Sequence, residues 1–380
     1  MNQKFHYFRS YVLLTQLYYN QTQLFHSMTH SSLKLLILLL PALIMSAKSS
    51  ANNNSIAGRP QNEFSITAYC SYNTFHPSQY IADNNWDILT AFREEGPVSR
   101  LDSMNIPYNS SQLRLLMVGD LLTYSNGILK TKMPIFDKEQ TDGLRGESKV
   151  FSDSIYPLIE PKIKELVSLL TKSGYGAQTY SLIFSYLLDG YIWDDGKLPT
   201  QQQTTDHGTW EGAYWAMYDK RKEDRDGTNQ YGPLTINWTD QLGYWPGDKL
   251  LLSFARCIAD NKLPVQDKKL REKLIKYNLV NSDGQPVIPV IKHGNKDQAD
   301  LLCDEIATIV SGAVNEYAGK IASTYNIPSQ QDAAVIFYHE VMWDLRSLLL
   351  SNGIIHKPAI LNGEEVGPEH FSDITFIVEE

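Results

Sequence analysis

The residues best suited to chemistry lie between positions 205 and 248. Asp206, His207 and Glu211 bring two carboxyl groups and an imidazole into one short stretch. On a helix, His207 and Glu211 would share a face, because they are four residues apart. Such a group can supply an acid, a base or metal ligands, so these three are the candidate catalytic residues.

Aromatic side chains are the second feature of this segment, which holds four of the seven Trp of the chain. Indole and phenol rings form platforms for sugar rings or for apolar partner surfaces. The candidate binding residues are Trp210, Tyr214, Trp215, Trp238 and Trp245. The alternative is that these rings fill the space between two halves of the chain.

Other motifs support no metal or cofactor. His339-Glu340 begins the HExxH zinc motif, but position 343 is Trp, so the second ligand is missing. His339 is therefore interpreted as a core or interface residue. The cysteines, Cys70, Cys257 and Cys303, lack CxxC spacing, and at most one disulfide can form among three thiols. There is no glycine loop for phosphate and no GxSxG motif.

Composition describes an ordinary globular protein of 380 residues, long enough for two or three domains. It is 42% hydrophobic and 20% charged, so it can bury a substantial core. The net charge is -9, with a pI near 5.5, which disfavours a protein that coats nucleic acid.

The first fifty residues predict export. An apolar run from Leu35 to Met45 follows Lys34, and small residues follow the run. Eleven apolar residues suit a signal peptide, over Met28–Ser49 or similar, better than a membrane span. We expect residues 1–50 to be the signal and its upstream tract, 51–60 a flexible leader, and the mature chain to lack a transmembrane helix.

Positions 86 to 136 organise the rest of the chain. Apolar periodicity predicts short helices over 86–92, 98–104 and 113–121, and Asn126-Gly127 predicts a hairpin leading into 130–136. This order resembles the winged-helix superfamily at the level of fold. Before it, Glu63 to Cys70 alternates like an edge strand, and after it Asp137 to Lys149 is predicted to be a loop and Ser154 to Lys172 a helix.

The pattern recurs over 249–291, with helices over 249–259 and 267–280, an Asp283-Gly284 turn and an outgoing strand over 287–291. Long helices over 300–325 and 332–350 follow. We interpret the recurrence as an internal duplication; the alternative is a chance similarity of two helical halves. The fold prediction is α+β, mainly α, with two winged-helix-like modules each followed by a helical pair: 61–200 is the first half, 201–248 an aromatic-rich connector and 249–380 the second half.

The resemblance to winged helices implies that the helix before the wing reads DNA. Such a helix needs basic or amide side chains. The first copy offers Gln112 and Arg114, beside Asp120. The second copy has basic residues at Lys268, Lys269, Arg271, Lys273 and Lys276. Acidic residues are interleaved with them, which is equally typical of a solvated face.

Three functional hypotheses follow. The first is an exported, periplasmic or extracellular, non-catalytic binding protein of the cell envelope, with an unknown protein or glycan partner. The second is an exported hydrolase of envelope polysaccharide or peptide that uses Asp206, His207 and Glu211. The third is a membrane-tethered or cytoplasmic DNA-binding regulator, which requires the signal peptide to be absent.

Overall fold

The computed structural model describes residues 56, 58–70, 77–199, 212–221, 226–239, 241–243 and 245–379, without the side chains of 69–70, 77–78, 194–196 and 212–214. The segment Asn54–Glu380 forms one compact unit. The signal peptide and most of the leader predicted from the sequence lie outside the described residues. No helix within the described ranges is long and apolar enough to cross a membrane.

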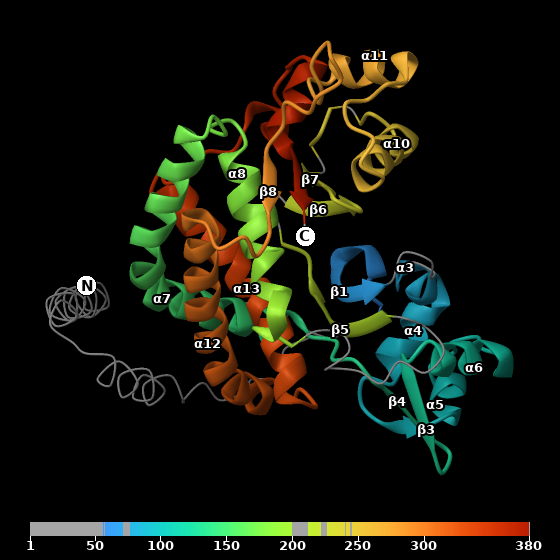
Figure 1. Cartoon of the computed structure of the whole chain (residues 1–380). Helices are drawn as coiled ribbons and strands as arrows, with labels where there is room; N and C mark the ends of the chain where they lie inside the picture. The colour runs from blue at the N-terminus through green and yellow to red at the C-terminus, as the bar shows by residue number, and fades with distance from the viewer. Residues whose placement is uncertain are drawn as a thin grey trace, which may run out of the picture. The chain divides into compact units, whose positions relative to one another are not determined.

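The fold is α+β and mainly α, as predicted (Figure 1). The described elements follow in this order: η2 (Gln61–Glu63), β1 (Phe64–Cys70), α3 (Pro77–Ile81), α4 (Asn84–Ala91), β2 (Gly96–Pro97), α5 (Ser99–Ser103), α6 (Ser110–Val118), β3 (Leu122–Ser125), β4 (Ile128–Thr131), α7 (Lys138–Lys172), α8 (Thr179–Ser181), η3 (Leu182–Leu188), η4 (Tyr191–Gly196), β5 (Gly212–Asp219), β6 (Asp226–Tyr231), β7 (Leu234–Thr239), α10 (Asp248–Ala259), α11 (Lys268–Lys276), β8 (Val290–Lys292), α12 (Gln298–Tyr325), α13 (Gln330–Ser351), η5 (Ala359–Asn362), η6 (Pro368–Ile374) and β9 (Thr375–Glu379).

The segment from α4 to β4 has the predicted order of short helices and a hairpin. Asn126 and Gly127 adopt φ values of 51° and 83°, which is the left-handed geometry of a tight hairpin turn. β2 lies between α4 and α5 and pairs with β4, so the sheet order is β2-β4-β3. Trp86, Leu89, Leu116 and other apolar residues form a separate core beneath these elements.

The prediction of a loop over 137–149 is wrong, because α7 begins at Lys138. Asp137 and Gln140 form a reciprocal capping box that satisfies two of the first free N–H groups. Leu144 is fully buried on the inner face of the helix. Gly143 lies on this helix where an added Cβ would come within 3.1 Å of the Tyr325 hydroxyl, so this glycine allows close packing rather than a loop.

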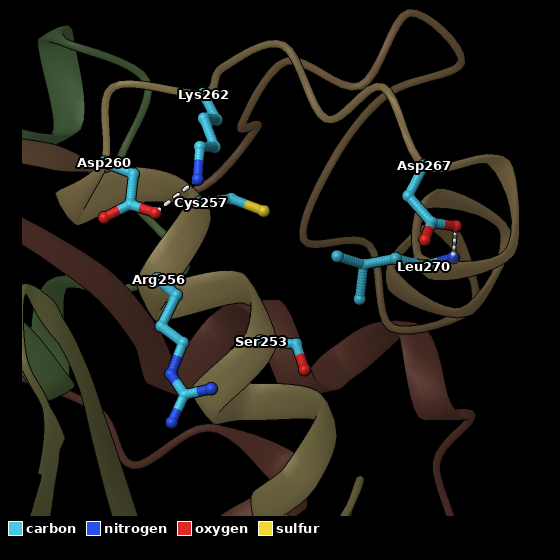
Figure 2. A pocket seen from close by; sticks show the side chains of 7 residues that line it. All are labelled: Ser253, Arg256, Cys257, Asp260, Lys262, Asp267 and Leu270. Atoms are coloured by element: carbon cyan, nitrogen blue, oxygen red, sulfur yellow. Dashed lines mark hydrogen bonds and ion pairs between the residues drawn. The ribbon is translucent and has the colours of Figure 1, made fainter.

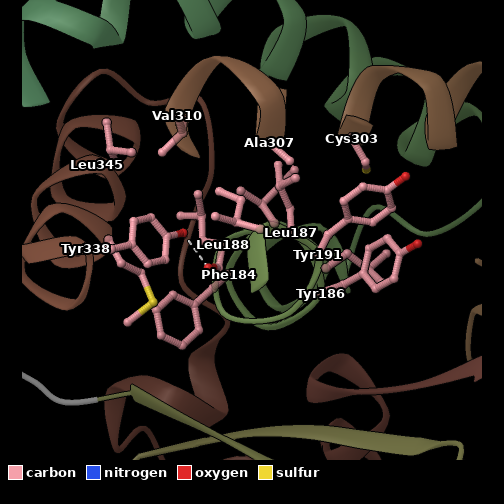
Figure 3. Close-up of a cluster of buried hydrophobic side chains, with 14 of the residues drawn as sticks. Phe184, Tyr186, Leu187, Leu188, Tyr191, Cys303, Ala307, Val310, Tyr338 and Leu345 are labelled. Atoms are coloured by element: carbon pink, nitrogen blue, oxygen red, sulfur yellow. Dashed lines mark hydrogen bonds between the residues drawn. The ribbon is translucent and has the colours of Figure 1, made fainter. Parts of the chain in front are cut away.

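α7, α12 and α13 pack together as a bundle that contains the larger core (Figure 1). A buried π-helix, η3, follows α8 and packs against them; Figure 3 shows Phe184 and Leu187 of η3 facing α12 and α13. The hydroxyl of Tyr338 on α13 donates to the carbonyl of Leu188. The apolar segment over 180–193 therefore forms three short helical pieces rather than one regular α-helix.

Asp189 ends the π-helix, and burial raises the pKa of its carboxyl to about 6. The unfolded pKa is near 3.9. The folded protein therefore binds this proton more tightly, and stability falls as the pH rises from about 4 through 6.

We expect Asp189→Asn to stabilise the protein by about 2 kcal/mol at pH 8 and by almost nothing at pH 4. Thermal denaturation followed by circular dichroism at both pH values measures this difference. Asp102→Asn, at an exposed position of α5, is the control. An equal effect of Asp189→Asn at the two pH values would contradict the raised pKa of the Asp189 carboxyl.

The described parts of the predicted connector are strands that belong to the folded unit. β5 pairs antiparallel with β1, and β7 pairs with both β6 and β9. The register of β1 against β5 shifts between Thr67 and Ala68, so Trp215 is an extra, bulged residue. Met217 faces the smaller core whereas Ala216 and Tyr218 face the bundle, so β5 joins the two cores.

The second half departs from the predicted wing. A turn over 281–284 is present, but only an isolated bridge joins Val280 to Pro286. The outgoing strand is β8, which starts at Val290 and pairs parallel with β9 instead of with the segment before the turn. Pro286 and Pro289 lack N–H donors, which prevents a regular antiparallel ladder there.

Local backbone geometry nevertheless recurs in the two halves. α6 and α11 are both capped at the N-terminus by an acidic or amide side chain, Asn109 and Asp267. Left-handed residues follow corresponding helix ends and occupy corresponding turns: Asn105 and Asn261, Asp120 and Asn278, Gly127 and Gly284.

Candidate functional site

A pocket of about 640 Å³ lies between α7, α13 and the end of β5. Six lining residues come from α7 at helical spacing: Lys138, Asp142, Arg145, Gly146, Lys149 and Asp153. The others are Asp344, Ser347, Leu348 and Ser351 on one stripe of α13, and Asp219, Lys220 and Arg221 at the end of β5. Spacings of three and four place the α7 residues on one face of that helix, and the same holds for the α13 residues.

Glu340 lies at the base of this region, with a side chain that is only 2% exposed. Nε of Arg145 donates to its carboxylate at 3.1 Å and Nε of Arg221 at 3.0 Å. A buried carboxylate is tolerated when it is paired and hydrogen-bonded, and two guanidinium groups satisfy both conditions. Because Glu340 binds both Arg145 and Arg221, its structural role is to connect α13 with α7 and with the end of β5.

Asp344 lies one helical turn after Glu340, next to the same arginines. Ser148 donates its hydroxyl to this carboxylate at 2.6 Å, and the guanidinium of Arg221 lies 3.6 Å away. Burial raises the pKa of Asp344, and the bond from Ser148 and the charge of Arg221 oppose that rise. Arg145 also donates to the carbonyl of Asp219 at 2.6 Å. These bonds fix the inner wall of the pocket.

At the rim, some charges are paired and two are not. Lys138 pairs with Asp142 at 2.8 Å, and Asp219 accepts a bond from Arg59 at 2.8 Å. Among the described residues, the ammonium groups of Lys149 and Lys220 have no hydrogen-bonded or ion-paired acceptor. The pocket therefore has a neutralised inner wall and two available cations.

Gly146 is an exposed residue of α7 that lines the pocket. A Cβ added at this position would meet no atom within 4 Å. Glycine in a helix interior costs about 1 kcal/mol relative to alanine. Packing does not require this glycine, and the lack of a side chain leaves the helix backbone accessible at this point of the pocket.

The predicted catalytic residues Asp206, His207 and Glu211 lie outside the described residues, as does Trp210. Tyr214 lies in β5 opposite Ala68, and its side chain is likewise outside the description.

The three described tryptophans of the proposed platform lie in different environments. Trp215 is 7% exposed and packs in the bundle core, so it offers no surface to a ligand. Trp238 covers Gly227 on the neighbouring strand, where an added Cβ would come within 2.5 Å of the ring. Trp245 donates its N–H to Asp248 at 2.9 Å and packs on Phe371. Their main structural role is packing.

His339 is half-buried on α13. Its Nδ1 bonds to the carbonyl of Val335 at 2.8 Å, and its ring packs against Trp193. Burial lowers the pKa of its imidazole. No cluster of metal-ligating side chains occurs in the part of the chain that the structure describes.

A second pocket, of about 370 Å³, lies between α10 and α11 and contains Cys257 (Figure 2). Asp260 pairs with Lys262 at 2.6 Å, and Asp267 caps α11 by accepting bonds from Lys269 and Leu270. Burial raises the pKa of the Cys257 thiol, which disfavours the reactive thiolate. These groups give no acid–base or nucleophilic arrangement.

Sequence reasoning missed the site formed by Arg145, Arg221, Glu340 and Asp344. Arg145 falls in the loop predicted over 137–149, and Glu340 belongs to the incomplete HExxH motif. The available signal was the presence of two carboxylates, one turn apart, in an otherwise apolar helix. Such acids need cationic partners when buried, but nothing in the sequence identifies which ones.

Comparison with protein-family models, with curated proteins and with solved structures found no match to this chain.

Proposed function

We propose that the chain is an exported, non-catalytic binding protein of the cell envelope, which holds a small polar ligand in the pocket between α7 and α13. The observation that carries this proposal is the pairing of Glu340 with Arg145 and Arg221. An acid engaged by two guanidinium groups is unsuited to proton transfer, whereas the fixed wall that results is suited to recognition. Export rests on the apolar run over 35–45 and the small residues that follow it.

We also propose that residues 84–131 are a winged-helix-like module and that the two halves arose by duplication. The strand order β2-β4-β3 and the recurring left-handed residues support this proposal. DNA reading is not favoured. The side-chain amide of Gln112 donates hydrogen bonds to Asn84 and Asn85, so its N–H groups are already used within the fold. The outward face of α6 instead carries Leu115 and Val118, which are 62% and 61% exposed.

The experiment is non-denaturing mass spectrometry of the protein recovered from the exported fraction of its own cells. We expect a shortened N-terminus and a small-molecule mass that is released on denaturation. Gly146→Trp, which places an indole in the open pocket, should be recovered without that mass. Gly146→Ala, which adds only a methyl group, should retain it.

Two results would overturn the proposal. One is a wild-type protein without bound mass. The other is an unchanged bound mass in a Gly146→Trp variant whose circular dichroism matches the wild type. An intact N-terminus in the cytosol would remove the exported part of the proposal.

A further inference from the structure

We propose, as an extension of the binding function above, that the ligand carries an anionic group, either a carboxylate or a phosphate ester. The anion is held between the ammonium groups of Lys149 and Lys220. Neither ammonium group has a hydrogen-bonded or ion-paired acceptor among the described residues, although Asp153, one turn beyond Lys149 on α7, interacts with Lys149 through its charge. An ammonium group donates up to three hydrogen bonds and binds carboxylate or phosphate as a point charge.

The two lysines approach the pocket from different elements. Lys149 extends from α7 and is exposed, and Lys220 follows β5 and is half-buried. The backbone N–H of Lys220 donates to the carbonyl of Glu63 at 2.9 Å, which fixes the start of its side chain. Cations on two separate, anchored elements can contact one anion from two sides.

Carboxylates of the pocket would repel an anion if they were uncompensated. Asp142 and Asp219 are paired with Lys138 and Arg59. Asp344 has Ser148 and Arg221 beside it, and burial raises the pKa of its carboxyl toward the neutral form.

Asp153 is the remaining acid of the pocket, one turn beyond Lys149 on α7. Burial raises the pKa of Asp153, and Lys149 opposes that rise. At the β5 end of the pocket, Asp219 is paired with Arg59, and Lys220 has no hydrogen-bonded or ion-paired acceptor among the described residues.

Gly146 leaves the helix backbone of α7 accessible beside Lys149. Gly146 and Lys149 are three residues apart on α7, so they lie on the same face. With no atom within 4 Å of the missing Cβ, a ligand can lie against the helix backbone beside the Lys149 side chain.

The lining chemistry disfavours a neutral glycan at this pocket. Sugar rings are usually held on aromatic faces, and the residues that line the pocket include no aromatic ring. Leu348 is the one large apolar residue among them. Binding therefore depends on charge rather than on stacking.

The test is isothermal titration of the purified full-length chain with three probes: inorganic phosphate, citrate and maltose. We expect phosphate or citrate to bind and maltose not to bind. Stronger binding of phosphate identifies a phosphate ester, and stronger binding of citrate identifies a carboxylate. The double variant Lys149→Gln with Lys220→Gln should lose at least about tenfold in affinity. The matched control, Lys268→Gln with Lys273→Gln on the exposed face of α11, should bind like the wild type.

The proposal of an anionic ligand would be overturned if neither anion bound the wild type. It would also be overturned if the anions bound the double variant as tightly as the wild type. Non-denaturing mass spectrometry separates this failure from that of the binding function. If a ligand that depends on Gly146 is still recovered from native protein, the pocket binds a ligand and only its charge class is wrong. If no such ligand is recovered, both proposals fail.

Discussion

Replacing Glu340 with alanine is expected to lower the Tm by roughly 4 °C, which corresponds to a loss of about 3 kcal/mol in a domain of this size. The change removes the carboxylate that Arg145 and Arg221 share, and leaves two cations facing each other with side chains 21% and 15% exposed. Arg145 would then have no carboxylate partner among the described residues, and Arg221 would keep only the contact with Asp344 at 3.6 Å. Poorly paired, half-buried charges are costly because water cannot fully solvate them. Thermal denaturation followed by circular dichroism measures the effect.

Two further variants test whether the loss of stability comes from the buried charge of Glu340 or would follow the removal of any acidic side chain. Glu340→Gln keeps the shape and one acceptor, so it should fall between wild type and Glu340→Ala. Glu305→Ala removes an acid that is 55% exposed and paired with Lys162, so it should cost less than about 1 kcal/mol. If Glu305→Ala and Glu340→Ala had equal effects, Glu340 would not be a buried structural clamp.

Asp226→Ala is the second variant for which we expect a large loss, of about 4 kcal/mol. Asp226 starts β6, and its side chain is fully buried. It accepts bonds from the Tyr180 hydroxyl and from Arg346, and Lys357 lies 3.3 Å away. Its removal would leave two cations, 8% and 9% exposed, without this anion. The measurement is the shift of the thermal midpoint.

The control for this prediction is Asp304→Ala. Asp304 pairs with Lys197 at 2.9 Å but is 54% exposed, so its loss should be nearly neutral. Asp226→Asn keeps the hydrogen-bonding shape without the charge and should be destabilising to a smaller extent than alanine. A neutral Asp226→Ala would mean that the buried cations are compensated by other groups.

Both predictions involve α13, which carries Glu340 and Asp344 toward α7 and β5, and Arg346 toward β6. The helix thus connects the bundle to two sheets through ion pairs as well as through its apolar residues. Loss of either carboxylate should weaken a contact between elements rather than the helix itself.

Local elements of the fold were predictable from the sequence. The edge strand over 63–70, the short helices around 86–121 and the Asn126-Gly127 hairpin are present in β1, α4, α5, α6, β3 and β4. Apolar periodicity and turn residues determine such elements, because both act over a few neighbouring positions. For the same reason the first part of α7 was misassigned: Gly143 and Gly146 resemble loop residues when their packing is unknown.

The sequence by itself determined the mainly helical α+β class, the hairpin turn and the incomplete metal motif at His339. Tertiary structure alone decided that Trp215 is buried, that β8 pairs with β9 and that Arg145 and Arg221 meet at Glu340. Burial and ion pairing join residues that are far apart in the chain. The energies of burial and of ion pairing depend on the packed environment of each residue, and a local pattern of residue types does not specify that environment.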